Sequence, residues 1–187
     1  MRIDVPEGTD PLVHASANLG NREMAMARAQ LTRLVYSLQT TLTPRELEAA
    51  RARLARINQC AFCLRYRPAR DRAGWADDPD VVPEEVYEHV ENAAEWPGYS
   101  ARERLAIQLA EGYALEHTNV PESVWNGIHE HFTDDELIDL MNCISVWFAY
   151  GRMNRMLEVD TSCLLPAAEV SALIAAATAR LPTATSG

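Results

Sequence analysis

Apolar residues recur every three or four positions along most of the chain, which is the spacing of helices that bury one face. The pattern is clearest after Thr43, where Leu47, Ala50, Leu54 and Ile57 share one side of a helix. No stretch alternates apolar and polar residues for long enough to predict a strand. The pattern therefore predicts an all-α fold, organised as a single-domain helical bundle.

Several predicted helix starts carry side chains that can bind the free N–H groups of a first turn. Three of them place Ser or Thr three residues before Glu, the capping-box pattern: Thr43 with Glu46, Ser100 with Glu103, and Thr133 with Glu136. Together with the apolar spacing, these signals predict helices that begin after Thr43, run from Cys60 to about Arg67, and cover residues 22–38, 84–93, 101–116, 122–130 and 134–156.

The same pattern divides the chain into three parts. Residues 1–40 form an N-terminal arm and helix, of which residues 1–20 are expected to be loosely ordered. Residues 41–160 form the helical core, and residues 161–187 form a C-terminal helix and tail. The segment 134–156 is apolar on nearly every side, so we expect it to be deeply buried or shared with another subunit.

The net charge of the chain limits the kinds of molecule that it is expected to bind. The 187 residues carry a net charge of −10, and all 17 basic residues are Arg. A negative protein is repelled by nucleic acid and by anionic membranes, so we expect neither as a partner. Neither a signal-peptide core nor a membrane-spanning segment is evident, which predicts a cytoplasmic protein. In that compartment a Cys-x-x-Cys pair is more often catalytic or metal-binding than structural.

The pair Cys60 and Cys63 is the feature that points most directly to chemistry, and Glu48 lies twelve residues before it. Two thiols one helical turn apart can close and reopen a disulfide. Arginines outnumber acids between Arg45 and Arg72, which favours thiolate over thiol, although a solvated basic face gives the same pattern. A zinc site would need two further ligands. An inert buried pair is the remaining alternative.

The spacing of Glu48, Cys60 and Cys63 resembles the carboxymuconolactone decarboxylase-like superfamily, and most closely its alkyl hydroperoxidase D-like branch. Three later segments are also similar to that family: Trp96 with the capped helix start at Ser100, the segment His131-Phe-Thr-Asp-Asp-Glu-Leu-Ile-Asp-Leu, and the closing helix through Phe148-Ala-Tyr-Gly-Arg-Met-Asn-Arg-Met. The resemblance covers about residues 40–160.

This resemblance implies a helical fold that assembles as a homotrimer or homohexamer. It also implies a thiol-dependent peroxidase that needs no cofactor, takes a small-molecule hydroperoxide and is reset by an external dithiol donor. By position, Cys63 would attack the peroxide, Cys60 would resolve the sulfenic acid into a disulfide, and Glu48 would take part in a proton relay.

One position departs from the family pattern. The family commonly has His four residues after the second cysteine, where this chain has Arg67. Arg stays protonated and cannot act as a base, but it can stabilise a thiolate electrostatically. Two other functions therefore stay open, a cofactor-free lyase acting on a lactone acid and a redox-inactive oligomeric binding protein.

Overall fold

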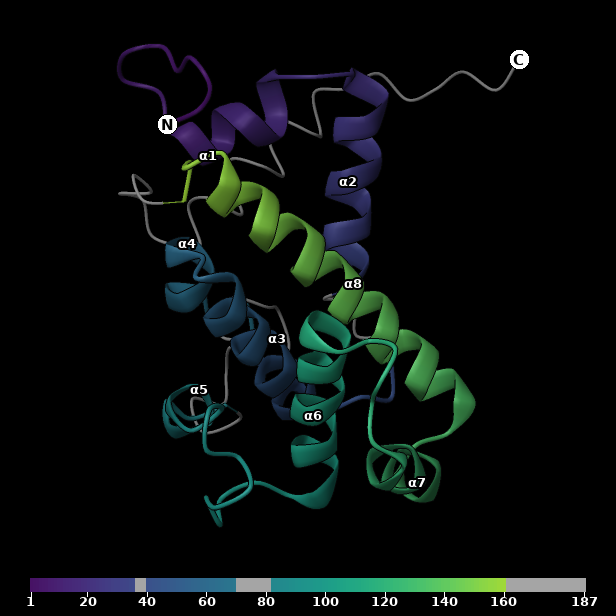
Figure 1. Ribbon diagram of the computed structural model, residues 1–187. Coiled ribbons are helices and arrows are strands. Elements are labelled where there is room, and N and C mark those ends of the chain that lie inside the picture. The colour runs from purple at the N-terminus through teal and green to yellow at the C-terminus, as the bar shows by residue number, and fades with distance from the viewer. Residues whose placement is uncertain (36–39, 70–81, 161–187) are drawn as a thin grey trace, which may run out of the picture.

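The computed structural model describes residues 1–35, 40–69 and 82–160, and every regular element in these ranges is helical. The all-α prediction is therefore confirmed for them, while the predicted C-terminal helix lies outside them. Figure 1 shows the arrangement. The elements are α1 (Pro11–Val13), the π-helix η1 (His14–Asn18), α2 (Arg22–Leu34), α3 (Pro44–Asn58), α4 (Ala61–Arg65), α5 (Glu85–Glu88), α6 (Ala101–Leu115), α7 (Glu122–His131) and α8 (Asp134–Met156).

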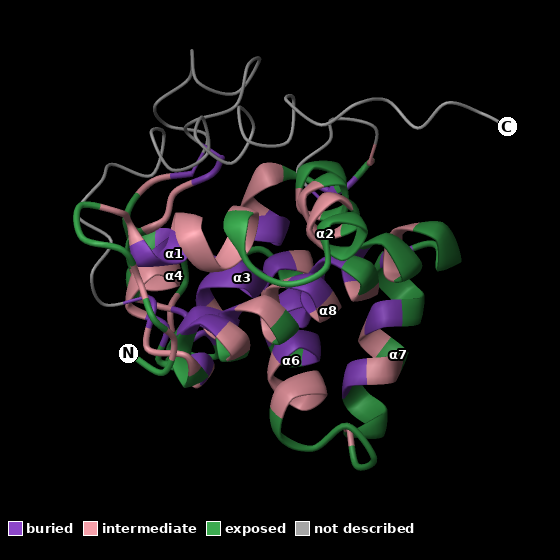
Figure 2. Cartoon of the chain, turned by 90° about the horizontal axis from the view of Figure 1, so that it is seen from above, coloured by how far each residue is buried: buried purple, intermediate pink, exposed green. Residues whose placement is uncertain are grey.

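Helix α3 is the centre of the fold. It packs against α6 and α8 on its main apolar side, and against α5 and α4 elsewhere. Most of its residues are buried, whereas α2 has no buried residue, and Figure 2 shows this contrast. Because α3 is enclosed on several sides, polar side chains that it carries inward are held in fixed surroundings.

The three predicted capping boxes are all present, at the starts of α3, α6 and α8. Their glutamates are also joined across helices by arginines from the same first turns. Arg102 of α6 binds both Glu46 of α3 and Glu136 of α8, and Arg45 of α3 binds Glu103 of α6. The first turns of three helices are thus connected by ion pairs as well as by apolar packing.

The boundaries of the long helices agree closely with the predicted ones, but two short helices are shorter than predicted. Helix α5 ends at Glu88 instead of residue 93, and α4 ends at Arg65 instead of about Arg67. The predicted helix over 22–38 ends at Leu34, and residues 36–39 lie outside the described ranges.

The expectation of a loosely ordered arm over residues 1–20 is wrong. Asp10 caps α1 by accepting a hydrogen bond from the N–H of Val13 (2.9 Å), and Leu12 is buried against Val159. The backbone N–H of Arg2 donates to the carbonyl of Leu157 (3.0 Å). The arm is ordered because it covers a small apolar cluster beside α4 and the end of α8. Over the described ranges, none of the helices combines the length and apolar character needed to cross a membrane.

Candidate functional site

The two cysteines lie where α3 ends and α4 begins. Gln59 adopts a left-handed conformation (φ 52°), which ends α3 and turns the chain by way of Cys60 into the next helix. Cys60 is the N-cap of α4, and its Sγ accepts a hydrogen bond from the N–H of Cys63 (3.3 Å). The Cα atoms of Cys60 and Cys63 are 5.2 Å apart, and the two residues form a disulfide.

The two sulfur-bearing residues differ in accessibility. Cys60 is completely buried (0% exposed), whereas Cys63 is partly exposed. Cys63 lines a cavity of about 190 Å³ between α3, α4 and α5. The other residues around this cavity are mainly charged or polar: Arg51, Ala52, Ala55, Arg56, Leu64, Arg67, Glu84, Tyr87 and Glu88. A small molecule in the cavity would therefore meet Cys63 and not Cys60.

Glu48 is buried in α3 and forms an ion pair with Arg51, which lies one turn further along the helix and lines the cavity. The two side chains are only 1% and 3% exposed. Arg51 donates to both carboxylate oxygens of Glu48, from Nε to Oε1 (2.9 Å) and from Nη2 to Oε2 (2.8 Å). Glu48 is thus not an exposed helix-terminal carboxylate, and its charge is matched by a guanidinium in bidentate geometry.

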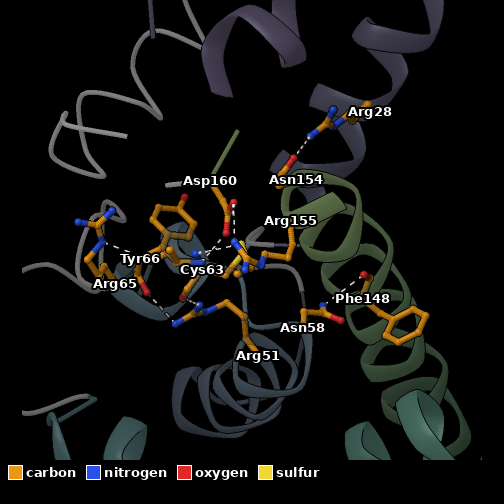
Figure 3. Close-up of a disulfide and its surroundings, with 12 residues drawn as sticks. Arg28, Arg51, Asn58, Cys63, Arg65, Tyr66, Phe148, Asn154, Arg155 and Asp160 are labelled. Carbon is orange, nitrogen blue, oxygen red and sulfur yellow. Dashed lines mark hydrogen bonds and ion pairs between the residues drawn. A yellow bond between two sulfur atoms is a disulfide. The ribbon is translucent and has the colours of Figure 1, made fainter. Parts of the chain in front are cut away.

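Arg51 also connects Glu48 to the cysteine helix. Its Nη1 donates to the carbonyl of Cys63 (2.8 Å), and its Nη2 donates to the carbonyl of Tyr66 (2.7 Å). Figure 3 shows Arg51 reaching from α3 toward these carbonyls. The sequence reading missed Arg51, although its position three residues after Glu48 is a known spacing for helical ion pairs.

Arg67 lies at the same end of α4, where its guanidinium has several partners. It pairs with Glu84, donates to the carbonyl of Leu64 (2.7 Å), and lies over the ring of Tyr87 (3.9 Å from its centroid). Arg67 also lines the cavity with Cys63. Its role as a thiolate-stabilising residue stays a prediction, since its positive charge is shared with Glu84.

Tyr87 of α5 lines the cavity and lies close enough to Glu48 to feel its charge. The residue is 3% exposed. Burial, and then the negative charge of Glu48, raise the pKa of its hydroxyl, so the phenol keeps its proton at neutral pH. Nothing local in the sequence distinguishes this tyrosine, because its contact with Glu48 arises from the packing of α5 on α3.

A second buried carboxylate, Asp160, lies at the opposite end of α4. Its Oδ2 accepts a hydrogen bond from the N–H of Ala61 (2.7 Å), and the residue is 0% exposed. Its buried Oδ1 has no hydrogen-bond partner within the described part of the chain and lies 3.9 Å from Nη1 of Arg155. Figure 3 shows Asp160 and Arg155 beside the disulfide. The sequence reading missed Asp160, since only the fold brings it to the cysteines.

Among the described residues, the remaining cysteine and the histidines do not line the cavity. Cys143 is buried in the core of α8, in agreement with a packing role, and Cys163 lies outside the described residues. His89 stacks on Trp96, and the residues that line the cavity beside Cys63 include no histidine. Within the described part of the chain, no group of three or more His, Cys, Asp or Glu is arranged to hold a metal ion.

Comparisons with known proteins give a distant relative without an assigned activity. The chain is 25% identical over 121 residues to the uncharacterized protein YdfG of Bacillus subtilis (strain 168). The matched region covers 64% of this chain and 78% of that protein. No protein-family model matches the chain. No solved structure matches it.

Proposed function

We propose that the protein is a thiol-dependent peroxidase that reduces small hydroperoxides through the Cys60–Cys63 pair. The observation that carries this proposal is the unequal accessibility of two cysteines that form a disulfide. Cys63 lines a cavity, whereas Cys60 is enclosed behind it. This arrangement suits a pair in which one sulfur meets the substrate and the other meets only its neighbour.

The proposed cycle conserves atoms and electrons. The thiolate of Cys63 attacks the distal oxygen of the hydroperoxide and the O–O bond breaks, which leaves a sulfenic acid on Cys63 and an alkoxide that takes a proton to become the alcohol. The thiol of Cys60 then attacks the Cys63 sulfur, and the disulfide forms with loss of water. An external dithiol returns two electrons and two protons to the pair.

Tyr87, with the charge of Glu48 acting on it, provides a proton donor that does not need the family's histidine. The phenol of Tyr87 keeps its proton before the reaction, because burial and the negative charge of Glu48 raise its pKa, and Tyr87 lines the cavity with Cys63. We propose that the Tyr87 hydroxyl donates the proton that the alkoxide takes, and that water in the cavity returns a proton to the phenolate. Tyr87→Phe should therefore slow sulfenic acid formation, and the disulfide should still close afterwards.

The direct test is oxidation of the reduced protein by one equivalent of cumene hydroperoxide, followed by thiol titration and peptide mass spectrometry. The proposal predicts rapid loss of two thiols and a mapped Cys60–Cys63 disulfide. Cys60→Ser should stop turnover and leave a sulfenic acid on Cys63 that dimedone traps. Cys163→Ser, which removes a thiol outside the pair, is the matched control. Unchanged thiols in the wild-type protein would refute the peroxidase function.

The size and polarity of the cavity also bear on the substrate. A volume of about 190 Å³ is below the range of about 300–1,000 Å³ that is usual for drug-sized ligands. Hydrogen peroxide and tert-butyl hydroperoxide should therefore oxidise the pair faster than a long-chain lipid hydroperoxide does. Stopped-flow rates for the three oxidants would check this, and a preference for the lipid hydroperoxide would contradict it.

A further inference from the structure

Asp160 is buried beside Cys60, and only one of its two carboxylate oxygens caps α4. Its Oδ2 accepts the hydrogen bond from the N–H of Ala61, the residue that directly follows Cys60. Among the described residues, none donates a hydrogen bond to its buried Oδ1, which lies 3.9 Å from Nη1 of Arg155. A buried carboxylate oxygen that receives no hydrogen bond lowers the stability of the fold, so we expect Asp160 to have a function that explains its presence.

The chemistry of Cys60 supplies that explanation. Cys60 is 0% exposed, so water has little access to its thiol, yet the thiol must lose a proton before it can attack Cys63. Glu48 is connected to the other end of α4, through Arg51 and the carbonyls of Cys63 and Tyr66. Asp160 is the carboxylate on the Cys60 side of the helix.

We propose that Asp160 is the proton acceptor for Cys60 when the disulfide closes. The carboxylate takes the S–H proton of Cys60 as the sulfur attacks Cys63, and the S–S bond forms. When Cys63 carries a sulfenic acid, the leaving hydroxide takes up the released proton and departs as water. This peroxide-driven form of the step rests on the proposed function, but the proton transfer itself belongs to the closing of any mixed disulfide on Cys63.

The closing step can be followed without peroxide. One equivalent of DTNB added to the reduced protein should release a first thionitrobenzoate when Cys63 attacks it, and a second when Cys60 closes the disulfide. Asp160→Asn keeps an oxygen that accepts from the Ala61 N–H but removes the base. It should slow the second release by about 10²-fold or more and leave the first unchanged. Asp10→Asn, the same change at the cap of α1, should alter neither release.

Two results would overturn the proposal. One is a second thionitrobenzoate release in Asp160→Asn at the wild-type rate. The other is equal slowing of both releases, which would show that the substitution only removes the helix cap.

The pH profile of the wild-type chain gives a test that does not depend on a folded variant. Among the described residues, the charged side chains outside α4 that bind its backbone are Arg51 of α3, Asp160 after the end of α8, and Arg67. They pair with Glu48, Arg155 and Glu84.

With Asp160 as base, closure in the wild-type protein should stay fast between pH 8 and pH 6. A tenfold fall in closure rate per pH unit over that range would mean that an unassisted thiol near its ordinary pKa of about 8.5 governs the step, and the proposal would be wrong. Failure of cumene hydroperoxide to oxidise the pair would refute the peroxidase function and leave this measurement intact.

Discussion

Replacing Arg51 by Met should destabilise the protein more than any other single arginine substitution on α3. Met fills a similar volume but removes the positive charge, so Glu48 is left ionised and buried at 1% exposure. Removing one partner of a buried ion pair costs about 3–5 kcal/mol. The carbonyls of Cys63 and Tyr66 lose donors as well. A loss of about 4 kcal/mol is a large fraction of the roughly 5–15 kcal/mol typical of a folded protein.

The double variant Glu48→Leu with Arg51→Met separates the buried charge from the packing. Apolar side chains of similar volume often replace a buried ion pair at little cost, so the double variant should recover about half of the lost stability. Urea denaturation of the oxidised protein, followed by circular dichroism, measures the free energy of unfolding of each variant.

Arg56→Met on the same helix is the matched control. Arg56 is 40% exposed and lies 3.9 Å from Glu91, so its loss should cost less than about 1 kcal/mol. If Arg51→Met unfolds within about 1 kcal/mol of the wild type, or if the double variant is less stable than Arg51→Met alone, the buried pair does not support the site as argued.

Three further predictions concern the scaffold. Hydrogen bonds from Arg102 and from the Thr133 backbone lower the pKa of Glu136 from 4.5 to about 2, so this carboxylate stabilises the fold fully above about pH 5 and loses that contribution as the pH falls toward 2. Glu136→Gln should flatten the acid side of the stability profile. Gly151→Ala places a Cβ 2.6 Å from Nδ2 of Asn58 and should lower stability by about 1–3 kcal/mol in thermal melts, although Ala usually favours helices. The exposed apolar residues of α2, Met24, Leu31 and Leu34, predict self-association, and a monomer by light scattering at micromolar concentration would contradict it.

The long helices were predictable because local signals and global packing agree there. The capping boxes at Thr43, Ser100 and Thr133 begin helices where the apolar period also begins, and all three are present. The prediction was wrong for the N-terminal arm. Its order comes from Leu12 packing on Val159 near the far end of the described chain, and no local pattern reports such a contact.

The candidate site was predictable only where residues lie close together in sequence. The Cys-x-x-Cys spacing indicated a redox pair, and the two cysteines do form a disulfide. The partners of Glu48 and Arg67 could not be predicted, because they come together only when helices pack. Arg51 of α3 binds carbonyls at the end of α4, and the packing of α5 places Tyr87 under Arg67. Asp160 lies a hundred residues from Cys60 in sequence, so its place beside the thiol is a property of the fold.

The length of α4 explains why the site needs both buried carboxylates. A helix of five residues cannot hold its own shape, because helix formation gains too few hydrogen bonds to offset its nucleation cost. Tertiary contacts must therefore hold α4 at each end. Arg51, backed by Glu48, binds the carbonyl end, and Asp160 binds the N–H end. These contacts complement the helix dipole, with positive charge at the C-terminus and negative charge at the N-terminus. They involve backbone groups and not the sulfur atoms, so the disulfide can open and close while the helix that carries Cys63 stays in place.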